Sequence, residues 1–149
     1  EERGIMASRK HDILITQTQK SIPSGELDQE LTFNHPVKYI ACANTNMEST
    51  LTSVDNKIKI SVNGTDLSSF KWAKPHFVDV QSYYHTPDCF LHCFCLNTSS
   101  NQPSGSLNFS RLDNVKIHSQ DKKIIDPIYA VNYNILRVNN GMAGLRYAN

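Results

Sequence analysis

Charged side chains are scarce in this chain, since Asp, Glu, Lys and Arg make up 19% of its 149 residues. Soluble domains carry about a quarter. The formal net charge is +1, and the basic clusters Arg9-Lys10 and Lys122-Lys123 are short. Nucleic-acid-binding surfaces usually carry a basic face. The composition therefore argues against direct nucleic-acid binding and favours a strand-rich domain with a polar, weakly charged surface.

Long apolar runs are also missing. No stretch approaches the roughly 18 consecutive apolar residues that cross a membrane, and no signal peptide is recognisable. The chain begins Glu1-Glu2-Arg3 without an initiator Met, so we expect a processed product or a portion of a longer protein. A chain of this length can nevertheless form its own core, because a domain of this size buries about 70% of the surface that its unfolded form exposes.

The cysteines lack the spread of a secreted disulfide framework. Three of the four, Cys89, Cys93 and Cys95, crowd into one expected strand, and Cys42 stands alone. His85 and His92 lie close by and suggest zinc, but a tetrahedral site needs a second pair of ligands that the chain does not offer. We expect free, buried thiols in a reducing compartment, with a metal site as the weaker alternative.

Motifs for catalysis or cofactor binding are missing as well. The chain has no G-x-S-x-G turn for a nucleophile, no H-x-H pair, no phosphate-binding glycine loop and no dinucleotide fingerprint. Gly141-Met142-Ala143-Gly144 has the G-x-x-G form of some RNA-binding loops, but its place after a long strand indicates a turn near the tail. We therefore assign no catalytic, cofactor-binding or metal-binding residue, and we expect no enzyme activity and no small-molecule substrate.

Alternation of apolar and polar residues with a period of two is abundant, and it is typical of strands with one buried face. Residues 57–62 show it most cleanly. They end at Asn63-Gly64, a dipeptide that favours a two-residue hairpin because both residues tolerate positive φ. Residues 65–70 are the expected return strand.

Further strands follow from the same pattern. Residues 13–15 open an early strand that closes at the polar 17–19, and 31–42 form another, with Pro36 at an edge or bulge. Residues 77–84 and 89–96 are two more, the second apolar enough to be central and covered on both faces. A polar loop over 97–105 precedes a strand that contains Leu107, Phe109, Val115 and Ile117 on one side. Residues 128–138 form the longest strand, and regular structure ends at Asn140-Gly141 and Gly144.

About eight short strands separated by turns predict an antiparallel β-sandwich or barrel. Three glycosylation sequons begin at Asn63, Asn97 and Asn108. Asn and Ser are so common in this chain that we interpret the three as chance matches.

Several motifs resemble a known family. Residues 33–38 have the form F-x-H-x-V-K, residues 103–112 read PSGSLNFSRL, and residues 132–137 read NYNILR before a Gly-rich tail. Together with the opening 1–7, these motifs resemble, in order and spacing, the C-terminal half of iridovirus-type major capsid proteins of large double-stranded DNA viruses. The motif residues singled out as structural or interface candidates are Pro103, Gly105, Phe109, Arg111, Asn134, Arg137, Gly141 and Gly144.

The resemblance implies an all-β fold, an antiparallel eight-stranded jelly-roll sandwich. Residues 1–9 are then an inter-domain connector, and residues 10–149 are the second jelly roll of a double jelly roll whose first half is absent. It implies a structural virion protein that forms homotrimeric, pseudohexagonal capsomers of an icosahedral capsid. The implied partners are other copies, neighbouring capsomers and minor capsid proteins, with assembly in the host cytoplasm. No catalytic residue or cofactor is implied.

Two alternatives stay open from the residues themselves. A β-sandwich adhesion or carbohydrate-binding module could use an exposed aromatic shelf of Trp72, Phe77, Tyr83 and Tyr84. Arg137, which lies within the long terminal strand, could bond neighbouring strands, or it could anchor a contact with another subunit or domain.

Overall fold

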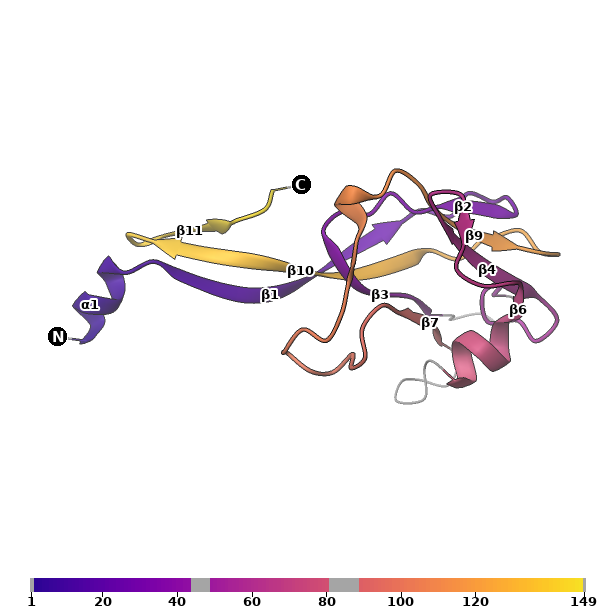
Figure 1. Ribbon diagram of the computed structural model, residues 1–149, viewed down its shortest axis with the longest axis horizontal. Coiled ribbons are helices and arrows are strands. Elements are labelled where there is room, and N and C mark those ends of the chain that lie inside the picture. The colour runs from indigo at the N-terminus through magenta and orange to yellow at the C-terminus, as the bar shows by residue number, and fades with distance from the viewer. Residues whose placement is uncertain (1, 44–48, 81–88, 149) are drawn as a thin grey trace.

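Two antiparallel β-sheets pack face to face in the computed structural model, which describes residues 2–43, 49–80 and 89–148 (Figure 1). Sheet A has the order β1 (His11–Ser21), β10 (Ile128–Asn139), β3 (Pro36–Ala43), β7 (Cys89–Cys93), with β11 (Met142–Leu145) beside β10 and β8 (Leu107–Asn108) beside β3. Sheet B has the order β2 (Asp28–Glu30), β9 (Val115–Ser119), β4 (Lys57–Val62), β5 (Thr65–Asp66), with β6 (Lys71–Trp72) also beside β4. The expected antiparallel sandwich is confirmed.

The core lies between the sheets and consists mainly of aliphatic and aromatic side chains. Val37 and Ile40 of β3, Ile58 of β4 and Ile117 of β9 are fully buried. Alternation along each strand places these side chains inward and the charged neighbours Lys57, Lys59 and Lys116 on the outer face. Full burial of one such side chain contributes roughly 1.5–3 kcal/mol.

The hairpin at Asn63-Gly64 is confirmed, since both residues have positive φ, 49° and 77°. Its return strand is shorter than predicted. β5 pairs with the end of β4, and after a break β6 pairs with the start of β4, so that Trp72 lies opposite Lys57. The break falls over residues 67–70, between β5 and β6.

The single strand predicted through Leu107, Phe109, Val115 and Ile117 is wrong. β8 belongs to sheet A and β9 to sheet B, and the 3-10 turn η2 (Phe109–Arg111) carries the chain from one sheet to the other. The side chain of Asn108 accepts a hydrogen bond from the Ser110 amide and so caps this turn. Phe109 remains buried because its ring packs in the core, against the rings of Phe33 and Phe94.

Two motifs separated by about seventy residues meet at this crossing. The rings of Phe33 and Phe109 pack edge to face at 5.9 Å. The Phe109 amide donates to the His35 carbonyl at 3.1 Å, and the His35 amide donates to the Ser110 hydroxyl at 2.8 Å. His35 itself has a positive φ of 67°, which directs the chain into β3.

The strand predicted over 77–84 is also wrong for the residues that the structure describes. Residues 73–80 form a π-helix, η1 (Ala73–Val80), and 81–84 lie outside the described residues. Ala73, Phe77 and Val78 share the buried face of this helix, and the Phe77 ring packs on Phe90 with centroids 4.9 Å apart. Helical spacing of three apolar residues was therefore misread as part of an alternating pattern.

Strand boundaries elsewhere differ from the predictions in physically clear ways. β1 continues through 17–19 to Ser21 because β10 pairs with it over the whole length. The strand predicted over 31–42 begins only at Pro36, and the register between β3 and β10 skips Lys38. The predicted central strand 89–96 ends at Cys93, and among the described strands it pairs only with β3, at the end of sheet A.

Lys38 is buried at this irregularity, with 5% of its surface exposed. Its ammonium group donates to the Ser100 carbonyl at 3.1 Å and lies 5.6 Å from the centre of the Tyr133 ring. A buried ammonium group needs such partners because burial removes its water. Lys38 thereby fixes the polar loop 97–105 to the sandwich.

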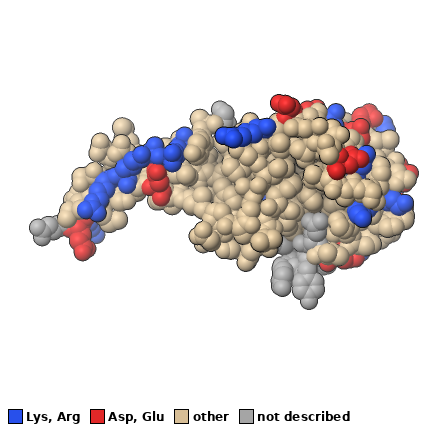
Figure 2. Space-filling model, in the orientation of Figure 1, with Lys and Arg blue, Asp and Glu red and all other residues tan. Residues whose placement is uncertain are grey.

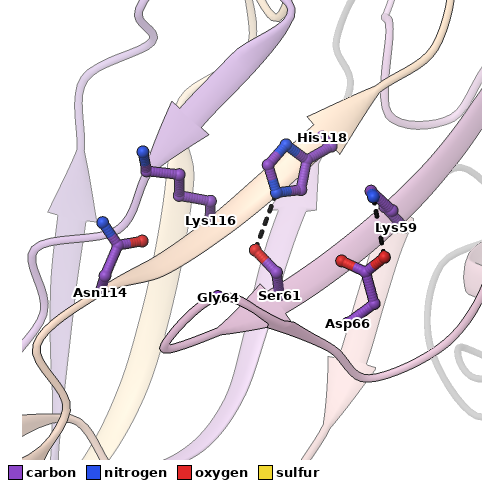
Figure 3. A pocket seen from close by; sticks show the side chains of 7 residues that line it. All are labelled: Lys59, Ser61, Gly64, Asp66, Asn114, Lys116 and His118. Carbon is purple, nitrogen blue, oxygen red and sulfur yellow. Dashed lines mark hydrogen bonds and ion pairs between the residues drawn. The ribbon is translucent and has the colours of Figure 1, made fainter.

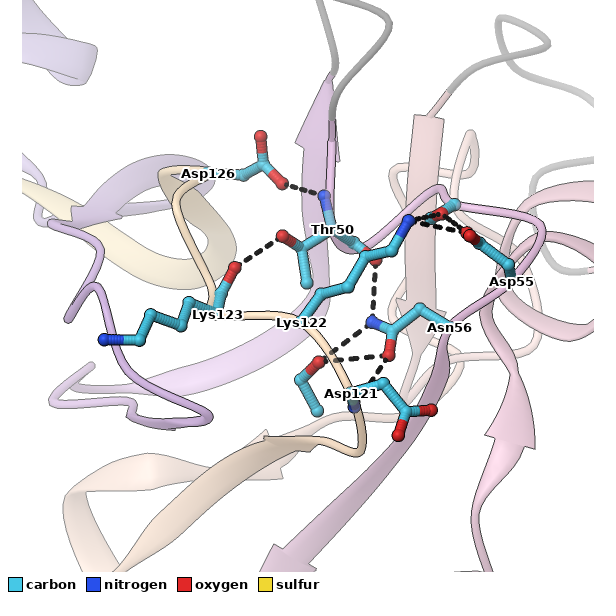
Figure 4. A network of polar contacts seen from close by, with 9 residues as sticks. Thr50, Asp55, Asn56, Asp121, Lys122, Lys123 and Asp126 are labelled. Carbon is cyan, nitrogen blue, oxygen red and sulfur yellow. Dashed lines mark hydrogen bonds and ion pairs between the residues drawn. The ribbon is translucent and has the colours of Figure 1, made fainter.

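A polar network joins two connecting segments at one end of the sandwich (Figure 4). The fully buried Asn56 donates to the Thr50 carbonyl and to the Ser119 hydroxyl and accepts from the Asp121 amide. The Asp126 carboxylate accepts from the Thr50 amide at 2.9 Å. Backbone groups that no ladder can pair are satisfied here by side chains, as burial requires.

The most unusual feature of the shape is an arm that leaves the sandwich (Figure 1). The first half of β1, the second half of β10 and β11 form it, and α1 (Glu2–Ser8) lies at its tip. β10 and β11 are joined by Asn140-Gly141, with φ of 50° and 76°. The prediction that regular structure ends at these residues is therefore wrong, because they form a second hairpin turn. No helix in the described residues is long and apolar enough to cross a membrane.

Replacement of Gly105 by Ala should destabilise the sandwich by about 1–3 kcal/mol. Gly105 has a φ of 139°, and a Cβ there would lie 2.6 Å from the Phe94 carbonyl oxygen. Gly144→Ala is the matched control, because its Cβ would meet no atom within 4 Å. Urea unfolding should show a lower midpoint for the first variant and an unchanged one for the second, and equal midpoints would contradict this account.

Acid should weaken the fold through His92. Burial, with a smaller effect from His76, lowers the pKa of His92 from 6.5 to about 4. As pH falls from 6.5 to about 4, the unfolded chain binds a proton that the folded chain does not, so the free energy of unfolding decreases, by at most about 3 kcal/mol.

Urea unfolding of the natural chain and of His92→Gln at pH 7.5 and 4.5 measures this effect. The variant should lose less stability between the two pH values than the natural chain. The same loss in both proteins would show that His92 does not carry the pH dependence.

Candidate functional site

A hollow of about 380 Å³ lies on the outer face of sheet B (Figure 3). Strand pairing builds it, since Ser61 of β4 lies opposite Lys116 of β9, and Lys59 lies opposite His118. These residues alternate with the buried Ile58, Ile60 and Ile117, so they all project away from the core. The remaining lining residues come from the β4–β5 turn, from β5 and from the residue before β9: Gly64, Asp66 and Asn114.

Three side chains form a line across neighbouring strands at this hollow. His118 Nδ1 lies 2.7 Å from Asp28 Oδ1, and His118 Nε2 lies 2.8 Å from Ser61 Oγ. Because a carboxylate can only accept, Nδ1 donates to Asp28, and in the neutral ring Nε2 accepts from the Ser61 hydroxyl. The sequence does not predict this line, because residues 28, 61 and 118 are far apart in the chain and only the pairing of β2, β9 and β4 brings them together.

The order Ser, His, Asp is that of a hydrolytic triad, but the setting differs from one. Ser61 is only 6% exposed and lies in a regular strand between Lys116 and Asp66. A catalytic serine instead projects from a strained turn beside amide groups that stabilise the oxyanion. The line therefore serves to hold β2, β9 and β4 together.

Two lysines of β4 are committed to neighbours beside the hollow. Lys59 donates to Asp66 at 2.8 Å and lies 5.1 Å from the centre of the Phe70 ring, and Lys57 lies 4.6 Å from that of Trp72. Such exposed pairs contribute little individually. They do cover one face of each aromatic ring.

The aromatic shelf that a carbohydrate-binding module would need is not formed as predicted. Phe77 is 1% exposed and belongs to the core, and Tyr83 and Tyr84 lie outside the described residues. Trp72 is half exposed, with Lys57 over its ring. Of the four predicted residues, only Trp72 is seen at the surface.

The four cysteines carry thiol groups and form no disulfide bonds. Burial raises the pKa of each of them, to about 12 for Cys42 and about 11 for Cys93. A thiol binds metal or attacks as the thiolate, which burial disfavours here. In the part of the chain that the structure describes, no three His, Cys, Asp or Glu side chains come close enough to hold a metal ion.

Of the interface candidates of the 103–112 motif, only Phe109 is buried. Gly105 lies against the Phe94 backbone, and Phe109 packs in the core. Pro103 and Arg111 are exposed. The sequon residues Asn63, Asn97 and Asn108 use their side-chain oxygens to accept from nearby backbone amides, and their modification stays untested.

The candidates of the terminal strand lie on or beside the arm. Asn134 is 2% exposed and donates to Gln17 Oε1 at 2.8 Å and to the Tyr147 carbonyl at 2.9 Å. Arg137 donates to both carboxylate oxygens of Asp12, at 2.8 and 3.0 Å. Gly141 forms the turn, and Gly144 lies opposite Arg137. Arg137 thus bonds a neighbouring strand, and its role in contacts with another subunit stays a prediction.

The arm carries an excess of positive charge on the surface shown in Figure 2. Residues 2–16 and 134–148 contain five basic side chains, Arg3, Arg9, Lys10, Arg137 and Arg146, against the acidic Glu2 and Asp12. Arg137 lowers the pKa of Asp12 through its hydrogen bond, which keeps this carboxylate charged. A surface that covers the arm is therefore expected to be rich in acidic groups.

Hydrolysis of an activated ester tests the structural interpretation of the Ser61 line. We expect the turnover of p-nitrophenyl acetate by the chain to equal that by its Ser61→Ala variant, because the buried hydroxyl lacks the setting of a nucleophile. A rate at least tenfold higher for the natural chain would contradict this. Comparable unfolding midpoints would show that both proteins are folded in the assay.

The chain is similar to several known viral proteins. Residues 2–144 match the family described as large eukaryotic DNA virus major capsid protein. The chain is 29% identical to the major capsid protein of Pyramimonas orientalis virus, with all of this chain aligned to 46% of that protein. It is 28% identical to the major capsid protein of Paramecium bursaria Chlorella virus 1, with all of this chain aligned to 51%.

The fold of the chain is also similar to that of a viral capsid protein. The structure superimposes on a chain of the quasi-atomic model of the PBCV-1 virus capsid with a TM-score of 0.77 and 25% identity, covering 99% of this chain and 54% of that chain. This confirms the jelly-roll fold. The chain spans about half the length of the curated relatives that it matches. By sequence and by fold, the chain belongs to the major capsid proteins of large eukaryotic DNA viruses.

Proposed function

We propose that this chain is the second jelly-roll half of a major capsid protein and that it builds a viral shell through repeated contacts between copies. The observation that carries the proposal is the superposition of nearly the whole chain on about half of a capsid chain. In this proposal, residues 1–9 connect two jelly rolls and residues 10–149 form the second one. The relatives, about twice as long, leave room for a first half of similar size.

The proposed assembly is a homotrimer with a pseudohexagonal outline. Cyclic symmetry repeats one interface three times and so closes the ring. The trimers contact neighbouring capsomers and minor capsid proteins in an icosahedral shell that is assembled in the host cytoplasm. Permanent interfaces of this kind often bury about 2,000 Å² or more, and exposed apolar side chains on the arm and on the sandwich are available for that purpose.

No chemical step is part of the proposed role. The buried Ser61, the raised thiol pKa values and the structural character of the relatives all support a protein that acts through shape and contact. In this proposal the sandwich is the rigid part of the protein, and its core folds without a cofactor. Specificity then comes from the arm and the loops.

The test begins with the coding sequence upstream of Glu1, which should encode another strand-rich domain of similar size. The extended polypeptide, expressed and purified, should have three times its subunit mass by light scattering after size exclusion. Its particles should have a hexagonal outline in negative-stain images. A monomeric extended polypeptide that binds a glycan would sink the proposal and favour the binding-module alternative.

A further inference from the structure

For its length, the arm exposes more large apolar side chains than the rest of the described molecule does. Seven of the sixteen large exposed hydrophobic side chains of the described residues belong to segments 2–16 and 134–148, namely Ile5, Met6, Ile13, Leu14, Met142, Leu145 and Tyr147. Contiguous exposed apolar surface on a soluble protein usually marks an interaction site.

Both faces of the arm are apolar. Ile13 and Leu14 are neighbours in a strand, so their side chains point to opposite faces, and they are 49% and 45% exposed. Leu136 and Ile135 lie opposite them in β10. Large apolar side chains on both faces of this three-stranded ladder are therefore in contact with water, which usually marks a surface that another protein segment covers. The hydrogen bonds of the arm do not remove these side chains from water, so a further protein segment is needed to bury them.

The outer edge of β11 is open among the described strands, because β11 pairs only with β10. Its sequence, Met142-Ala143-Gly144-Leu145, has no charge, and all four residues are exposed. The Arg146 amide donates inward, to the Ile135 carbonyl. Since amides alternate along a strand, those of Ala143 and Leu145 point outward. An uncharged, open edge of this kind is a template for a further strand.

We infer that the β11 edge accepts a strand from the preceding half of the full-length capsid polypeptide, and that the same half covers the apolar faces of the arm. This rests on the function proposed above, in which that half is joined to this chain through residues 1–9. α1 lies at the arm tip, close to the β10–β11 turn (Figure 1). A covalent connection there gives the preceding half a high effective concentration at the edge of β11.

The chemistry of the docking segment follows from the arm. The strand carries apolar side chains that contact Met142 and Leu145, because edge pairing gives affinity and alternate side-chain contacts give register. Acidic side chains flank it, since the arm carries an excess of three positive charges over residues 2–16 and 134–148. This combination distinguishes the expected segment from an arbitrary hydrophobic strand.

Hydrogen exchange of the extended polypeptide, measured by mass spectrometry and compared with the 149-residue chain, tests the inference. The amides of Ala143 and Leu145 should exchange at least about tenfold more slowly in the extended polypeptide. Ala143→Pro removes only an outward donor, so it should abolish the added protection of Leu145. Leu96→Lys changes a 95% exposed apolar residue of the sandwich and should leave the protection unchanged.

The outcomes separate this inference from the proposed function. Equal exchange in both polypeptides, in a protein that still forms trimers, would overturn the inference alone. Protection that disappears when trimers are diluted to monomers would also overturn it, because the strand would then come from a second copy. Protection in an extended polypeptide that is monomeric at every concentration would support the inference and contradict the proposed assembly.

Discussion

The pairing of β1 with β10 is the constraint on which the rest of the structure depends. The two strands stay in register from His11 opposite Val138 to Ser21 opposite Ile128. In the sandwich, β10 lies between β1 and β3, and in the arm it lies between β1 and β11. Amide side chains stabilise the point at which the ladder passes from the sandwich into the arm. There Asn134 and the fully buried Asn132 both donate to Gln17. One ladder thus holds the core together and also carries the arm on which the preceding half is proposed to dock.

The turns were the part of the fold that the sequence predicted best. Whether a turn joins two strands or ends regular structure, however, depends on the residues that follow it. Asn63-Gly64 was correctly predicted as a hairpin because alternating residues precede it. Asn140-Gly141 has the same conformation, and yet it was interpreted as the end of regular structure. The short strand that follows it has no polar alternation and little β propensity at Gly144, so only its pairing with β10 reveals it.

Contacts between residues far apart in the chain explain why the other elements were predicted wrongly from the sequence. Phe109 and Val115 lie on one parity of the sequence, and nothing local indicates that η2 moves the chain between sheets. Phe77 fits alternation as well as helical spacing, and contact with Phe90 decides between them. The Ser61, His118 and Asp28 line could not be predicted, because it depends on the registers of three strands. The capsid family was predicted correctly, because its motifs act as fingerprints independent of such pairing.

Continuity of β1 and β10 also has a mechanical consequence. Neither strand contains Gly or Pro, the residues that weaken or interrupt a strand, where the arm leaves the sandwich. A pull along the arm loads the hydrogen bonds of this ladder in parallel, as in shear, whereas a pull across a hairpin end breaks them one after another. The arm is therefore a stiff extension of sheet A, through which a pull at its tip reaches the sandwich without unzipping the ladder.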